Sequence, residues 1–100
     1  MIQLIVTAND ALYERLMTQS ADGQEPLRAT NVLNGFKLAT LNAVDQVVVD
    51  MALHAADTLI ETLHARPETA HMQIYVVKSG KQIPFELRRL CTDILEIKTL

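Results

Sequence analysis

Residues 46–50 read Gln-Val-Val-Val-Asp, and this short stretch decides the fold that the sequence predicts. Three consecutive valines without polar alternation are typical of a strand that is covered on both faces, as strands are in a parallel sheet. The stretch ends on a charged residue, Asp50, which would stand at the carboxyl end of a buried strand. An isolated buried charge is costly, so this carboxylate needs a partner.

On either side of this strand, short apolar runs alternate with amphipathic stretches. Further strands are expected at residues 2–6, 26–30, 72–77 and 94–98, and helices at residues 10–18, 32–42, 55–65 and 84–91. Asn9 and Asp10 before the first helix and Asn31 before the second are good capping residues. For the second helix we expect Val32, Leu33 and Phe36, together with Ala39 and Ala43, to face inward. This alternation predicts a doubly wound α/β domain with a five-stranded parallel sheet and helices on both faces.

Composition narrows the class of protein. One hundred residues, 49% of them hydrophobic, suit a single packed domain over residues 1–100. The net charge of −3 argues against a nucleic-acid module. Cys91 is the single cysteine, which excludes an internal disulfide and favours the cytoplasm. No apolar run is long enough for a membrane helix, so we expect a soluble protein.

The chemistry is expected at the carboxyl ends of the strands, where open parallel sheets place their functional crevice. Asp50 follows the central strand, and the other strands end next to a small set of mostly polar residues. These are Thr7, Ala8, Asn9 and Asp10 after the first strand, Lys78 and Ser79 after the fourth, and Lys98 after the fifth.

Four segments carry a family resemblance. They are IVTANDALYERLM (5–17), VDQVVVDMALHAADTL (44–59), RPETAHMQIYVVKS (66–79) and LCTDILEIK (90–98). Together they resemble the response-regulator receiver domain, with Asp50 at the phospho-acceptor position. The resemblance implies the strand order 2-1-3-4-5. It also implies a fifth helix after the last strand, whereas this chain stops at Leu100. We therefore expect an open apolar sheet face, covered by a partner or by a downstream output domain of a longer protein.

The sequence departs from the receiver pattern at several positions. The acidic pair that holds Mg²⁺ in receivers falls on Thr7-Ala8 or Ala8-Asn9, none of which is a carboxylate. Lys78 stands where receivers have Thr or Ser, and their fifth-strand lysine falls on Ile97 or Lys98. We therefore expect no metal and no cofactor. Our hypothesis is that Lys78, Lys98 or both pair with Asp50.

The resemblance and its departures predict a pseudo-receiver: a non-enzymatic signalling or localisation module that acts through a protein partner or a homodimer. Receivers of this kind commonly use the fourth helix and fifth strand, which implies an interface of Pro84, Phe85, Arg88, Arg89, Ile94 and Glu96. The alternative is a working receiver that is phosphorylated on Asp50 in a two-component phosphorelay. A second alternative is a small α/β enzyme or sulfur carrier that uses Cys91, which would require an exposed thiol with a lowered pKa.

Overall fold

The computed structural model describes residues 2–19, 26–78 and 83–96. Its strands are β1 (Gln3–Val6), β2 (Leu27–Ala29), β3 (Gln46–Asp50), β4 (Gln73–Lys78) and β5 (Asp93–Glu96). Its helices are α1 (Asp10–Gln19), α2 (Val32–Leu41), α3 (Ala56–Ala65) and α4 (Phe85–Arg88). Strands and helices alternate along the chain, as the sequence predicts.

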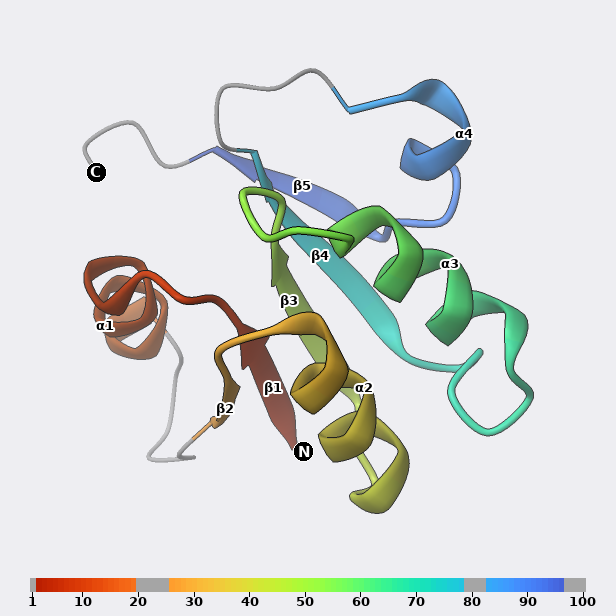
Figure 1. Ribbon diagram of the computed structural model, residues 1–100, viewed down its shortest axis with the longest axis horizontal. Coiled ribbons are helices and arrows are strands. Elements are labelled where there is room, and N and C mark those ends of the chain that lie inside the picture. Colours follow the sequence, from red (N-terminus) through yellow and green to blue (C-terminus); the bar gives the residue numbers. More distant parts are fainter. Residues whose placement is uncertain (1, 20–25, 79–82, 97–100) are drawn as a thin grey trace.

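The five strands form one parallel sheet in the order β2-β1-β3-β4-β5 (Figure 1). This confirms the predicted fold class and strand order. The valine strand β3 is central, with β1 on one side and β4 on the other. All strands point the same way, so the residues that follow β1 and β3 meet at one edge of the sheet (Figure 1).

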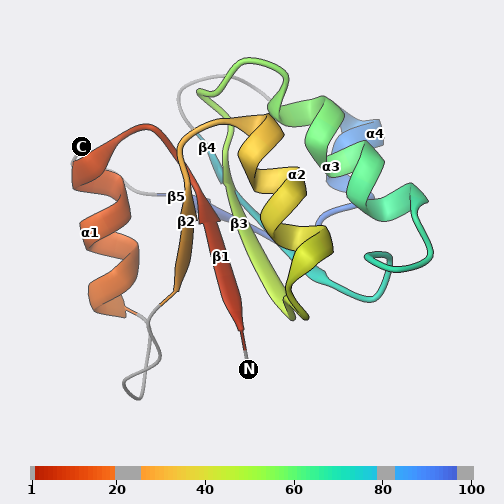
Figure 2. The same cartoon turned by 60° about the horizontal axis from the view of Figure 1, so that its bottom comes forward.

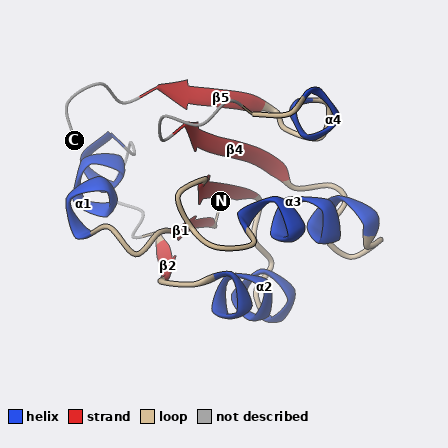
Figure 3. Ribbon diagram, turned by 45° about the horizontal axis from the view of Figure 1, so that its top comes forward, coloured by secondary structure: helices blue, strands red, loops and turns tan. Residues whose placement is uncertain are grey.

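The two faces of the sheet are covered unequally. The helix α1 lies on one face, while α2, α3 and α4 lie on the other (Figures 2 and 3). Because side chains alternate along a strand, Val47 and Val49 enter the larger core cluster and Val48 the smaller one beneath α1. On the α1 face, Tyr75 of β4 and Leu95 of β5 are half-buried. These two side chains lie on the part of the described sheet where the sequence predicts an open apolar face.

Local residue choices explain where the helices begin and end. The carbonyl oxygen of the Asn31 side chain accepts the Asn34 N–H at 2.9 Å, which confirms the predicted cap of α2. The helix α3 ends at Ala65 because Arg66 precedes a proline and takes an extended conformation. The predicted extent of the fourth helix, to residue 91, is wrong. After Arg88 the chain forms turns that are tighter than an α-helix, because the Cys91 N–H donates to the carbonyl of Arg88, only three residues earlier.

The predicted inward face of α2 is also wrong in part. Ala39 is buried, as predicted, but Leu33 is 64% exposed, Ala43 is exposed, and the other buried position of the helix is Gly35, which was not predicted. A Cβ atom on Gly35 would lie 3.0 Å from the Val6 side chain, so α2 packs closely on β1 at this point. Small residues therefore face the sheet, and a larger one turns outward.

In the described residues, no helix is both long and apolar enough to cross a membrane.

Candidate functional site

The candidate site lies where the neighbouring strands β1 and β3 end. Val6 pairs with Val49, so the residues that follow them, Thr7 and Asp50, stand side by side. The Thr7 hydroxyl donates a 2.7 Å hydrogen bond to Oδ2 of Asp50. Thr7 is 0% and Asp50 5% exposed, so this contact is shielded from water. The buried carboxylate has its partner in a neutral hydroxyl from the adjacent strand.

The second oxygen of Asp50 fixes the loop that follows β3. Oδ1 accepts the backbone N–H of Ala52 at 2.9 Å, two residues along the chain, as aspartate side chains commonly do in turns. The Thr7 hydroxyl in turn accepts the backbone N–H of Asn9 at 3.0 Å. One set of hydrogen bonds thus joins Asp50, the end of β1 and the loops that follow both strands.

The remaining groups of the β1–α1 loop are engaged elsewhere. The Asn9 side chain accepts the Leu12 N–H at 3.1 Å and caps α1. Asp10, the other predicted cap, begins the helix and forms a 2.7 Å ion pair with Arg28 of β2. Its side chain is 85% exposed. Ala8 is exposed and brings only a methyl group.

The hypothesis that Lys78 pairs with Asp50 is wrong. Lys78 lies at the end of β4 with an exposed side chain. Among the described residues, the ion pairs are Arg28–Asp10 and Arg66–Glu68. The register explains the outcome, because Val77 stands opposite Asp50 and side chains on adjacent positions of a strand point to opposite faces. Ser79 and Lys98, also predicted at this edge, lie outside the described residues.

The residues of the site do not fit a Mg²⁺ ion. Mg²⁺ requires near-octahedral coordination by hard oxygen ligands, usually including one or two carboxylates. At the receiver acid-pair positions, Thr7 offers a hydroxyl already bonded to Asp50, Ala8 offers no ligand atom, and the Asn9 oxygen caps α1. Across the part of the chain that the structure describes, no three His, Cys, Asp or Glu side chains gather closely enough to hold a metal.

The loop after Asp50 separates two hollows of the surface. Toward α4 lies a hollow of about 420 Å³, which includes Ile83, Pro84 and Leu87. Toward α2 lies a larger, mostly apolar groove of about 710 Å³, with Val32, Leu33, Phe36 and Leu59 in its wall. Ala55 belongs to both walls and takes the left-handed conformation, φ 63° and ψ 23°. An L-residue with a Cβ is strained there, whereas glycine is not.

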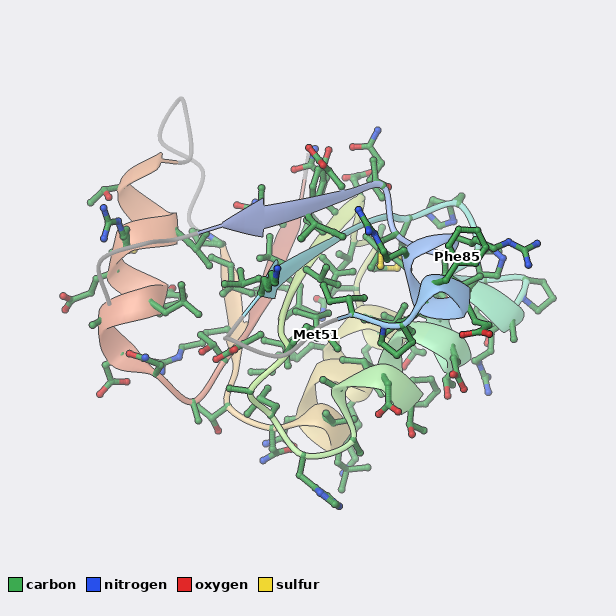
Figure 4. All side chains as sticks on the ribbon, turned by 90° about the horizontal axis from the view of Figure 1, so that it is seen from above. Met51 and Phe85 are labelled. Atoms are coloured by element: carbon green, nitrogen blue, oxygen red, sulfur yellow. The ribbon has the colours of Figure 1, made fainter. Side chains whose placement is uncertain are left out.

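The predicted interface on α4 and β5 is only partly presented to solvent. Phe85 is 73% exposed on α4, on the part of the molecule far from α1 (Figure 4). Pro84, Arg88 and Arg89 are also exposed. Ile94 packs against the core instead, because alternation along β5 turns it toward the helices α3 and α4. The side chain of Glu96 lies outside the described part of the structure.

Cys91 does not meet the requirements of a nucleophile. It is half-buried, and its thiol donates a 3.3 Å hydrogen bond to the Leu87 carbonyl. Burial raises the pKa of the Cys91 thiol, which reduces the thiolate fraction at neutral pH. The structure therefore disfavours the alternative of an enzyme or sulfur carrier that uses this residue.

The fold is a doubly wound α/β domain with an aspartate at the carboxyl end of its central strand. No protein-family model matches the sequence, and no curated protein matches it either. Solved structures do match. The N-terminal domain of a response regulator receiver protein from Methanoculleus marisnigri JR1 is similar with a TM-score of 0.82 and 15% identity. That alignment covers 98% of this chain and 85% of the other.

Two further structures agree. A putative response regulator from Chloroflexus aurantiacus J-10-fl aligns with a TM-score of 0.77 and 21% identity, over 95% of this chain and 83% of the other. The signal receiver domain of an HD domain-containing protein from Pseudomonas fluorescens Pf-5 aligns with a TM-score of 0.73 and 14% identity, over 95% and 74%. The chain therefore has the fold of response-regulator receiver domains.

Sequence reasoning missed Arg28. This residue lies on the short edge strand β2, and its guanidinium contacts the β1–α1 loop. A weak strand signal at residues 26–30 was present in the sequence, but no pattern linked it to the site. Since β2 neighbours β1 in the strand order, the adjacency of Arg28 to this loop follows from the topology once the order is known.

Proposed function

We propose that this chain is a pseudo-receiver: a non-enzymatic cytoplasmic module with the receiver fold that acts through protein–protein contacts and does not use Mg²⁺-dependent phosphorylation of Asp50. The observation that carries the proposal is the buried 2.7 Å hydrogen bond from the Thr7 hydroxyl to the Asp50 carboxylate. An oxygen that must attack a phosphoryl group is here the acceptor of a buried hydroxyl.

The chemistry of phosphoryl transfer supports this reading. A phosphoryl donor brings negative charge to a carboxylate that is itself negative, and a bound metal ion normally offsets that charge. The nearest carboxylate on the β1–α1 loop, Asp10, is paired with Arg28. The loop therefore supplies Asp50 with hydrogen-bond groups but with no anionic ligand for a cation.

The contact surface proposed for this module is the exposed part of α4. Phe85 presents a large apolar side chain to solvent, with Arg88 and Arg89 exposed on the same short segment. Aromatic and arginine side chains are enriched in protein interfaces. A second copy of the chain, another signalling protein or a downstream output domain is the proposed partner.

The experiment that tests the proposal is a titration with Mg²⁺ and beryllofluoride, followed by ¹H–¹⁵N NMR. Beryllofluoride stands in for the phosphoryl group on an aspartate. We expect the amide signals of Met51 and Ala52, next to Asp50, to stay unchanged. The working-receiver alternative predicts large Mg²⁺-dependent shifts at both amides, and such shifts would overturn the proposal.

A matched variant shows whether the missing acids are the reason. Ala8→Asp/Asn9→Asp places a carboxylate pair after β1, and the new aspartate at position 9 is also a good capping residue for α1. We expect Mg²⁺-dependent shifts at Met51 and Ala52 in this double variant. Its response also demonstrates that the titration can detect the complex, so a silent wild-type protein is informative.

A further inference from the structure

Arg28 makes an unusual set of contacts for a residue of an edge strand. It pairs with Ile5 in the register of β1 and β2, so its side chain lies on the face covered by α1. Its guanidinium carbon lies 4.7 Å from the centre of the Tyr13 ring of α1. One terminal nitrogen pairs with Asp10 at 2.7 Å and donates a longer hydrogen bond, 3.4 Å, to the backbone carbonyl of Thr7. Arg28 therefore contacts both the loop after β1 and the first turns of α1.

The partial burial of Arg28 carries a cost, since its side chain is 26% exposed but one of its donors is buried. Its Nε is buried and has no hydrogen-bond partner among the described residues. A buried donor without a partner is destabilising. An apolar side chain at this position would cover α1 without that cost, but it could not hold Asp10 or the Thr7 carbonyl.

Thr7 is the residue through which Arg28 reaches the buried site. Its carbonyl accepts from Arg28, whereas its hydroxyl donates to Asp50. The same hydroxyl accepts the N–H of Asn9, the residue immediately before Asp10. A chain of contacts thus links Arg28 and Asp10 to the hydroxyl that holds the carboxylate.

We propose that Arg28 is a latch that couples the exposed ion pair with Asp10 to the buried Thr7–Asp50 hydrogen bond. When Arg28 holds Asp10, the β1–α1 loop keeps the Thr7 hydroxyl on Asp50. An anionic side chain of a partner that takes the place of Asp10 releases the loop and loosens the Asp50 site. The inference stands on these contacts and does not depend on whether Asp50 is ever phosphorylated.

Amide hydrogen exchange in the Arg28→Met and Asp10→Asn variants tests the latch. The Asn9 amide reports on the Thr7 hydroxyl, and the Ala52 amide reports on Asp50. We expect Arg28→Met to speed exchange at both amides by about fivefold or more relative to core amides of β3 and α3, the lower end of coupling between linked sites. Asp10→Asn should act in the same direction but less, because Arg28 keeps its contacts with Tyr13 and Thr7.

The chain offers a matched control in Arg66. Arg66 also forms an ion pair, with Glu68, and its guanidinium carbon lies 5.1 Å from the centre of the Phe36 ring. Arg66→Met should leave the Asn9 and Ala52 amides unchanged relative to the core. The proposal is overturned if Arg28→Met accelerates these two amides no more than the core amides, or if Arg66→Met accelerates them equally. Should Arg28→Met fail to fold, Asp10→Asn decides the question, because it changes only an exposed side chain.

Discussion

The Thr7–Asp50 hydrogen bond gives a prediction whose size follows from the structure. Thr7→Val keeps the shape of the side chain and removes the hydroxyl. The Asp50 carboxylate then keeps the Ala52 N–H but loses its partner on β1, while only 5% of the residue is exposed to water. The N–H of Asn9 loses its acceptor as well.

A hydrogen bond to a charged group contributes about 1.5–3 kcal/mol, compared with about 0.5–1.5 kcal/mol for a typical neutral one. We therefore expect Thr7→Val to lower the free energy of unfolding by about 2 kcal/mol. For a chain of this size, that loss corresponds to a fall in Tm of roughly 8–16 °C. Urea denaturation followed by circular dichroism at pH 7 measures the change, with equal m-values required in both proteins.

Thr69 provides the control for this measurement. It is 1% exposed, and its hydroxyl also donates a 2.7 Å hydrogen bond, but to the neutral carbonyl of Leu63. Thr69→Val is the same substitution at the same donor distance and should cost about 1 kcal/mol. If Thr7→Val lowers the free energy of unfolding no more than Thr69→Val does, the Thr7 hydroxyl does not make a stronger hydrogen bond to the Asp50 carboxylate than Thr69 makes to a neutral carbonyl. That result would contradict the prediction.

Three other predictions concern the rest of the molecule. Ala55→Gly should raise the free energy of unfolding by about 0.5–1 kcal/mol, because the left-handed conformation costs alanine about 1–2 kcal/mol and the greater freedom of glycine in the unfolded chain offsets only part of this gain. Ala11→Gly, at an exposed position in the first turn of α1, should instead lower the free energy of unfolding, by less than the roughly 1 kcal/mol that glycine costs inside a helix. A loss of stability in both variants would contradict the strain at Ala55. Cys91 should react with a thiol reagent at pH 7 more slowly in the folded protein than in urea, since burial raises the pKa of its thiol. The same raised pKa should make the folded state lose stability as the pH rises above about 8.5, because the thiol of the unfolded chain ionises first. Equal labelling rates in the folded protein and in urea would contradict the raised pKa. Phe85→Ser should weaken any concentration-dependent self-association seen by sedimentation velocity, whereas Leu41→Ser, at an equally exposed apolar residue of α2, should not; the reverse pattern would move the interface away from α4.

The predictable part of this structure is the part that depends on local patterns. The valines of β3, the caps at Asn9 and Asn31, and the stop before Pro67 each act within a few residues, so the sequence reveals them directly. The inward face of α2 was harder because the apolar pattern included Leu33, which is exposed, and did not include Gly35. The sheet instead accepts Gly35, whose missing side chain lets the helix approach Val6.

The partner of Asp50 was less predictable because it lies 43 residues away in the sequence. Charge alone points to a lysine, and Lys78 follows a neighbouring strand. Side-chain alternation decides otherwise, since Val77 is opposite Asp50 and Lys78 is one position beyond. The relevant signal was topological: in the order 2-1-3-4-5, β1 lies beside β3, so the residue after β1 comes near Asp50 at the carboxyl end of β3. A predicted strand order is therefore more useful than charge for assigning partners at the sheet edge.

Asp50 also has a structural role that is independent of any metal ion. A buried charged group is often no more stabilising than apolar residues of similar volume, so stability alone does not require it. What the carboxylate provides is geometry, because Oδ1 holds the Ala52 N–H and thereby the start of the loop through Ala55. That loop forms a wall of both surface hollows, one beside α4 and one between α2 and α3. Under the function proposed above, an aspartate at this position would shape the surface that a partner meets, and this role requires no reaction at Asp50.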